Sequence, residues 1–109
     1  MTREIERNII SAVRYSKNVG VGNTCVCNHK NKTYVILHGN LVSEIDNKKH
    51  KIKLYDGGFQ SNVTKSRLNA TLRGVFLDYK VAKRNGTWYL LDGYGRIYKT
   101  FKNGMVLDF

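Results

Sequence analysis

The stretch GGFQSNVTKSRLNATL, residues 57–72, is where a chain of short strands turns into a helix. Its two glycines permit the unusual backbone angles that end a strand, and the hydroxyl and amide side chains that follow are typical of helix N-caps. Leucines at helical spacing then supply a buried side. The stretch predicts a strand end, a cap at Ser61, Asn62 or Thr64, and a short central helix.

The same stretch also has a functional interpretation. Free backbone N–H groups at a helix N-terminus, beside Ser61, Thr64, Lys65 and Arg67, form a natural seat for a phosphate group. The G-x-x-x-x-G-K-S/T spacing of a nucleotide-binding loop is absent. We therefore expect either a capped helix alone or a capped helix that also contacts phosphate.

The N-terminal stretch REIERNIISAVRYSK, residues 3–17, predicts an amphipathic helix because its apolar residues recur at helical spacing. Thr2 is placed to cap this helix, and acidic residues fill its first turn, where the helix dipole favours them. We therefore assign residues 1–18 to an N-terminal amphipathic helix with a basic edge. The edge consists of Arg3, Arg7, Arg14 and Lys17.

The segment TYVILHGNLVSEID predicts a first hairpin, because its Gly39-Asn40 pair favours a two-residue turn. A four-residue loop over residues 47–50 then returns the chain. This register sets Glu44 opposite Lys53, an opposite-charge pair that stabilises neighbouring strands. It also predicts a shared apolar face made of Ile36, Leu41, Ile45, Ile52 and Leu54.

Two Asn-Gly pairs predict the remaining hairpins. Asn85-Gly86, within DYKVAKRNGTWYLLD, favours a type I′ turn, and Asn103-Gly104 folds RIYKTFK onto MVLDF. Hairpins and two helices in a chain without proline indicate a compact α+β fold with antiparallel strands. We expect a single domain over residues 1–109.

The chain is strongly basic, with 19 Lys and Arg against 8 Asp and Glu and a net charge of +11. The charge is spread along the whole chain, which indicates a folded positive face rather than a disordered basic tail. Such a balance commonly indicates a polyanionic partner, and the plain alternative is a generally basic, solvated surface. The candidate residues for binding nucleic acid or an acidic partner are Arg3, Arg7, Arg14, Lys48, Lys49, Lys51, Lys53, Lys65, Arg67, Arg73, Tyr89 and Tyr94.

Aromatic and basic residues interleave over residues 79–102. Aromatic platforms beside basic side chains are typical of surfaces that hold single-stranded nucleic acid. Trp88 shares a strand face with apolar neighbours, so we expect it in the core rather than on such a surface. Tyr89 and Tyr94 are the better candidates for exposure.

Signatures of catalysis and metal binding are sparse. Cys25, Cys27 and His29 point to one face of a predicted strand, but a structural zinc site needs a fourth ligand, which His38 or His50 would have to supply. We expect two small strand cysteines there. No acidic spacing suggests a paired-carboxylate site, so we expect no enzyme and no cofactor.

Targeting signals are also missing. The sequence contains no apolar run of about 18 residues and no basic-then-apolar leader. Two cysteines within one strand give no disulfide framework. We therefore expect no membrane span and a location in the cytoplasm of the cell that makes the protein.

Four stretches carry a resemblance: NTCV at 23–26, VILHGNLVSEID at 35–46, GGFQSNVTKSRLNATL at 57–72 and WYLLDGYGRIYKTFKNGMVLDF at 88–109. With them the chain resembles a family of small proteins encoded by tailed bacteriophages, whose pattern includes LHGN and TKSRLNA. The resemblance covers about residues 20–109 and departs from the pattern at Phe59, usually Trp, and at Ser43, commonly Ala. It implies a phage origin, hence a bacterial host cytoplasm, and brings no catalytic residue.

Small phage proteins without catalytic motifs commonly bind host machinery or defence complexes, CRISPR effectors included. Resemblance and charge together predict a non-enzymatic binding protein that inhibits or redirects a host or defence nucleoprotein. Its basic face would be built from the first helix, the 48–53 hairpin and the 65–73 helix. The alternative is an accessory protein that binds DNA or RNA directly, and a metal-assisted enzyme at the cysteine strand is a third hypothesis.

Overall fold

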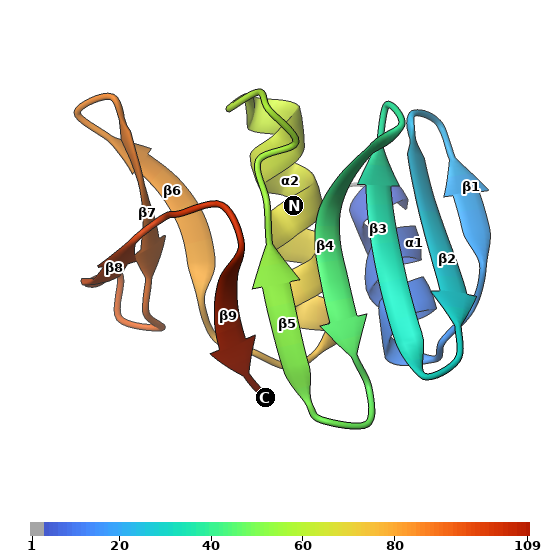
Figure 1. Cartoon of the computed structure of the whole chain (residues 1–109). Helices are drawn as coiled ribbons and strands as arrows, with labels where there is room; N and C mark the ends of the chain where they lie inside the picture. Colours follow the sequence, from blue (N-terminus) through green and yellow to red (C-terminus); the bar gives the residue numbers. More distant parts are fainter. Residues whose placement is uncertain (1–3) are drawn as a thin grey trace.

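The computed structural model describes residues 4–109, so Thr2 and Arg3 lie outside the described residues. Two helices and nine strands make up this part of the chain (Figure 1). In chain order they are α1 (Glu4–Arg14), β1 (Val19–Val21), β2 (Thr24–His29), β3 (Lys32–Leu37), β4 (Asn40–Asp46), β5 (Lys51–Leu54), α2 (Asn62–Gly74), β6 (Lys80–Arg84), β7 (Thr87–Leu91), β8 (Ile97–Thr100) and β9 (Met105–Asp108).

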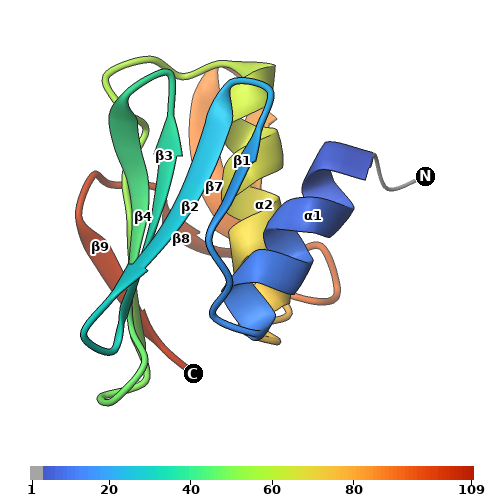
Figure 2. The same cartoon turned by 90° about the vertical axis from the view of Figure 1, so that its right-hand side faces the viewer.

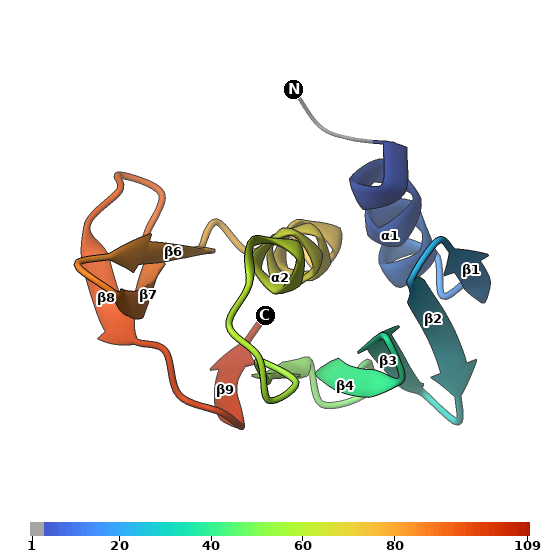
Figure 3. The ribbon, with the colours of Figure 1, turned by 90° about the horizontal axis from the view of Figure 1, so that it is seen from above.

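The strands form two antiparallel sheets around α2. Six strands pair in the order β1-β2-β3-β4-β5-β9, and three pair in the order β6-β7-β8. Seen from above, both helices cover one face of the six-stranded sheet, and the three-stranded sheet lies on the other side of α2 from α1 (Figure 3). The α+β class with antiparallel strands is therefore confirmed.

Both predicted helices form, and each buries the side that its spacing predicted. Ile9, Ala12 and Val13 of α1 are buried, as are Leu68 and Leu72 of α2. The two helices pack side by side on the sheet (Figure 2). Neither helix of the described chain is long and apolar enough to cross a membrane.

The close packing of α1 on α2 depends on Gly74. A Cβ atom at this position would lie 2.7 Å from Val13 Cγ1 and 2.8 Å from Val13 Cβ. Real side chains do not approach this closely, so only glycine lets the two backbones come together here.

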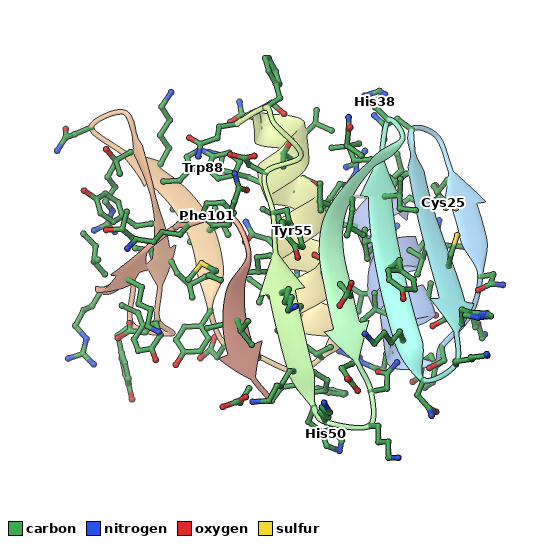
Figure 4. The ribbon with its side chains drawn as sticks, viewed as in Figure 1. Cys25, His38, His50, Tyr55, Trp88 and Phe101 are labelled. Carbon is green, nitrogen blue, oxygen red and sulfur yellow. The ribbon has the colours of Figure 1, made fainter. Side chains whose placement is uncertain are left out.

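The core fills the space between α2 and the two sheets. Ile45, Ile52 and Leu54 of the large sheet are fully buried toward the helices. Trp88 is 3 % exposed, as the sequence predicts, and packs edge-on against Phe101 with ring centres 5.4 Å apart (Figure 4).

The first hairpin differs from its predicted register by one residue. The turn consists of His38 and Gly39, with φ of 51° and 78°, so it is a primed turn placed one residue earlier than Gly39-Asn40. A bulge at Val42 then restores the alternation of β4. Consequently Ile36 and Leu41, predicted in the core, pair with each other on the open face.

The later part of that prediction is confirmed. Glu44 pairs with Lys53 and Ile45 with Ile52 across the loop over residues 47–50. The Asn85-Gly86 turn is also confirmed, because both residues have positive φ, 51° and 80°.

The prediction of a hairpin at Asn103-Gly104 is wrong. These residues turn the chain, with Met105 N donating to Lys102 O at 3.1 Å, but β8 pairs with β7 and β9 pairs with β5. The turn is held by the large sheet instead, since Gly104 N donates to Leu54 O at 2.7 Å. The last two strands therefore belong to different sheets.

Candidate nucleic-acid interface

The basic residues predicted to bind a polyanion do not form one face. Lys51 and Lys53 alternate with Ile52 and Leu54, which are buried toward the helices, so they project to the side of the large sheet that faces away from the helices. Lys51 Nζ lies 2.7 Å from Asp108 Oδ1, and Lys53 stands opposite Glu44. Acidic neighbours thus offset much of the charge on this side.

Lys48 and Lys49 lie in the β4–β5 loop, next to His50 at the lower end of the sheet in Figure 4. Asp46 Oδ1 accepts their backbone N–H groups at 3.1 and 2.9 Å. These bonds, first that from Lys49, hold the pKa of Asp46 below its ordinary value. The loop presents two exposed lysines beside Lys51 of β5.

The basic edge of α1 has a partly structural role. Arg7 and Arg14 are exposed, and Arg3 lies outside the described residues. Arg14 Nη2 donates to the carbonyl of Arg73 at 2.9 Å, and its guanidinium carbon lies 3.9 Å above the centre of the Phe76 ring. Arg14 therefore fastens the end of α1 to the end of α2.

Arg67, predicted as a phosphate ligand, is buried with 4 % of its surface exposed. Its Nε donates to Thr24 Oγ1 at 2.7 Å and its Nη2 to Asn23 Oδ1 at 2.9 Å. A further bond from Nη1 reaches Ser66 Oγ at 3.0 Å. The guanidinium thus joins α2 to the β1–β2 turn inside the protein, and no surface ligand can reach it.

Asn69, two residues further along α2, fastens the helix to the other sheet. Its Oδ1 accepts from Val81 N at 2.7 Å, and its Nδ2 donates to Val81 O at 3.2 Å. The side chain therefore occupies the outer edge of β6 as a neighbouring strand would. The Arg-Leu-Asn run of the central stretch holds both sheets on one helix.

The start of α2 confirms the predicted cap. Ser61 Oγ accepts from Thr64 N at 3.1 Å, and the Thr64 hydroxyl donates to Phe59 O at 3.1 Å. Protein groups therefore satisfy this cap from within the loop. Phosphate contact at this end stays a prediction, for which Lys65 is the nearest accessible basic side chain of the stretch.

A groove between α2 and β6 collects basic residues from separated parts of the chain. Its middle is a cleft of about 460 Å³, which shares lining residues with a hollow beside the start of α2 and with another hollow beside the β7–β8 turn. Lys65 and Arg73 line it from α2, Lys80 from β6 and Arg96 from the turn. We call it the α2–β6 groove. It brings two predicted basic residues together with two basic residues that were not selected from the sequence, and the predicted Tyr94 lines its turn end.

The groove opens onto the outer face of the three-stranded sheet. Lys80 and Ala82 alternate with buried Val81, so their side chains leave β6 on the side away from the core. Ala82 lines the groove and pairs with Tyr89, which pairs in turn with Thr100. Groove and outer face therefore form one surface, with half-buried Tyr89 at its centre.

Aromatic rings stand at the turn end of this surface. Tyr94 is 85 % exposed, and the guanidinium carbon of Arg96 lies 5.0 Å from its ring centre. Tyr79 and Tyr98 stack with ring centres 4.9 Å apart. Burial, followed by the neighbouring Tyr98, raises the pKa of Tyr79. Tyr94 thus has the exposure expected for it, and the stacked pair adds a wall that the sequence did not single out.

The backbone of the β7–β8 turn is hydrogen-bonded to Asp92. The Oδ1 atom accepts from Tyr94 N at 2.9 Å and from Arg96 N at 3.0 Å, and Oδ2 accepts from Arg96 Nε at 3.3 Å. These bonds, first that from the Arg96 backbone, lower the pKa of Asp92. These bonds hold the backbone of the turn that carries Tyr94 and Arg96.

Residues 79–102 are themselves strongly basic. They contain six Lys or Arg and a single Asp, and all six basic side chains are exposed. The interleaving of aromatic and basic residues in the sequence marks this segment. From that pattern, however, only Tyr89 and Tyr94 were named as binding residues. The six basic residues are Lys80, Lys83, Arg84, Arg96, Lys99 and Lys102.

The cysteine strand does not assemble the ligand set of a metal centre. Cys25 and Cys27 are half-buried on the open face of the large sheet, with their Sγ atoms 3.0 Å apart (Cys25 is labelled in Figure 4). Their mutual hydrogen bond is the main cause that raises the pKa of Cys27. Among residues 4–109 no three His, Cys, Asp or Glu side chains gather as metal ligands would.

Residues 2–108 match the model of a family described as Kyanoviridae Gp96 protein. No curated protein and no solved structure matches the chain.

Proposed function

The chain belongs to the Kyanoviridae Gp96 family of phage proteins, and we propose that it is a phage accessory protein that binds single-stranded nucleic acid in the α2–β6 groove. The observation that carries the proposal is the convergence of four basic side chains on one groove beside exposed and half-buried tyrosines. In this proposal the protein acts by covering the nucleic-acid strand and does not catalyse a reaction on it.

The chemistry of the groove suits a single strand better than a duplex. Lys65, Arg73, Lys80 and Arg96 can neutralise successive phosphates, while Tyr89 and Tyr94 offer ring faces to unpaired bases. Stacking tolerates every base, since each has a flat aromatic face. The bases of a duplex are already stacked on one another and cannot use these rings.

The inhibitory role expected from the sequence would use the same surface. A protein that covers the nucleic acid of a host or defence nucleoprotein blocks that complex without any catalytic residue. This target stays a prediction. A pull-down from host lysate with and without nuclease checks it, because a partner that remains after nuclease is held by protein contacts.

Fluorescence anisotropy with a labelled 12-nucleotide oligo(dT) tests the binding itself. Four phosphate contacts predict that log K falls with log salt concentration with a slope of about −2.8. The double variant Lys65→Glu/Lys80→Glu should weaken binding at least tenfold at low salt and flatten that slope by about half.

The matched control is Lys48→Glu/Lys49→Glu, which changes the net charge by the same amount in the exposed β4–β5 loop. If the groove binds the strand, this control should lose much less affinity than the groove variant. Equal losses in the two variants would mean that only overall charge matters, and the proposed groove would be wrong.

A further inference from the structure

The α2–β6 groove contains carboxylates as well as basic side chains, and they differ in what they already bind. Glu6, Asp78 and Asp92 line the central cleft. Glu6 Oε2 accepts from Ser66 Oγ at 3.1 Å, and both oxygens of Asp92 are bonded within the β7–β8 turn. Asp78 is the carboxylate of this cleft that has no hydrogen bond or ion pair within residues 4–109.

The exposed Asp78 carboxylate lies against Gly93. A Cβ atom on Gly93 would lie 2.0 Å from Asp78 Oδ2 and 2.7 Å from Asp78 Cγ. The carboxylate therefore occupies the space that any other residue at position 93 would fill. It rests against the turn backbone at the wall of the cleft, next to Tyr79.

We propose that this cleft binds one guanine base of the strand, with the Asp78 carboxylate as its recognition group. The proposal rests on the proposed function, because the groove delivers the strand to the cleft. A space of about 460 Å³ accommodates one nucleotide, and Tyr79, which stacks on Tyr98, provides an aromatic wall.

Guanine is selected because of the hydrogen-bonding groups on its pairing edge. An ionised carboxylate only accepts, through two oxygens side by side. Guanine presents two adjacent donors there, N1–H and the N2 amino group. Adenine and cytosine each pair one donor with an acceptor that would face the carboxylate, and thymine has a single donor between two carbonyl groups. A two-point contact of this kind discriminates roughly tenfold.

The test compares 12-nucleotide oligo(dT) strands that contain one central guanine, inosine or adenine. Inosine is guanine without its N2 amino group, so it removes one of the two donors and keeps the rest of the base. We expect the guanine strand to bind roughly tenfold more tightly than the other two. Equal affinity for guanine and inosine would overturn the proposal.

Two variants that change the net charge equally test whether the preference for guanine depends on Asp78. Asp78→Asn should reduce the preference for guanine to less than about twofold, because an amide offers a single accepting oxygen. Asp108→Asn, on β9 at the edge of the large sheet, should retain the preference. A preference that persists in Asp78→Asn would also overturn the proposal.

Failure of the groove and failure of the guanine site can be told apart. Strands that bind without base preference leave the proposed function intact and exclude the guanine site. If no strand binds, titration of the labelled protein with GMP and with IMP decides. If GMP shifts the amide signal of Gly93 and IMP does not, the guanine site is supported even though the protein binds no strand. If neither nucleotide shifts it, the guanine site is excluded.

Discussion

Replacing Arg67 by alanine should destabilise the protein severely, although the residue lies in a stretch that suggests phosphate binding. The side chain is buried and donates to Thr24, Asn23 and Ser66. Alanine removes two buried methylenes beyond Cβ, which is about 1.6 kcal/mol at 0.8 kcal/mol each. It also leaves Thr24 Oγ1 without its donor, at a cost of about 1–3 kcal/mol.

Together these effects lower the free energy of unfolding by about 3–4 kcal/mol. A domain of this size changes its Tm by about 4–8 °C per kcal/mol, so Tm should fall by at least about 12 °C. Urea unfolding followed by Trp88 fluorescence measures the effect, because Trp88 is buried in the folded state. The m-value should stay unchanged.

Lys65→Ala is the control, since the Lys65 side chain lines the groove without a hydrogen bond or ion pair in the described chain. It should change stability by less than about 0.5 kcal/mol. Arg67→Lys should recover only part of the loss, because an ammonium group cannot replace a planar fork of donors. If Arg67→Ala unfolds at the wild-type urea concentration and binds nucleic acid more weakly, Arg67 is a surface ligand and the buried network is wrong.

Three further predictions concern the frame that holds the groove. Asn69→Ala should cost about 2 kcal/mol in the same urea assay, because it leaves the N–H and C=O of Val81 without their partner; a change below 0.5 kcal/mol would contradict this role. Gly74→Ala should cost about 1–3 kcal/mol through its clash with Val13, and Val13→Ala should be less harmful in that background than in the wild type. Higher stability of Gly74→Ala would show that the helices have room to separate. Turn N–H bonds lower the pKa of Asp92 in the folded state, so its contribution is complete above the unfolded pKa of about 3.9 and is lost as pH falls through the lowered value. Asp92→Asn should therefore be less stable than wild type at pH 6 and approach it below pH 3; a constant difference between the two unfolding curves would exclude this linkage.

Local signals in the sequence predicted the local structure well. Asn85-Gly86 forms its hairpin because both residues accept positive φ, and the turn alone sets the register of β6 on β7. Ser61 caps α2 for a similarly local reason. Fold class, both helices and the burial of Trp88 follow from such short-range patterns.

The predictions of strand pairing failed where contacts between residues far apart in the sequence decide which of two possible turns or pairings forms. His38 accepts a positive φ, which moves the first turn by one residue and reverses the side chains of β3. Nothing local marks the bulge at Val42 that compensates. Asn103-Gly104 turns the chain as predicted, but β9 pairs with β5 of the large sheet and β8 pairs with β7.

The candidate site shows the same limit. Charge and aromatic content indicated a polyanion-binding surface, but not which basic residues share it. Arg67 and Lys65 are two positions apart on α2, and the helix turns one toward the β1–β2 turn and the other toward the groove. Lys80 and Arg96 reach Lys65 and Arg73 only through the tertiary fold.

The most direct measurement of the central claim is an NMR titration of isotope-labelled protein with 12-nucleotide oligo(dT). If the strand lies in the α2–β6 groove, the largest amide shifts should fall on residues 65–73, 79–82 and 93–96. Small shifts there, together with large ones in the β4–β5 loop or on the open face of the large sheet, would contradict the account and place the polyanion on the opposite side of the molecule.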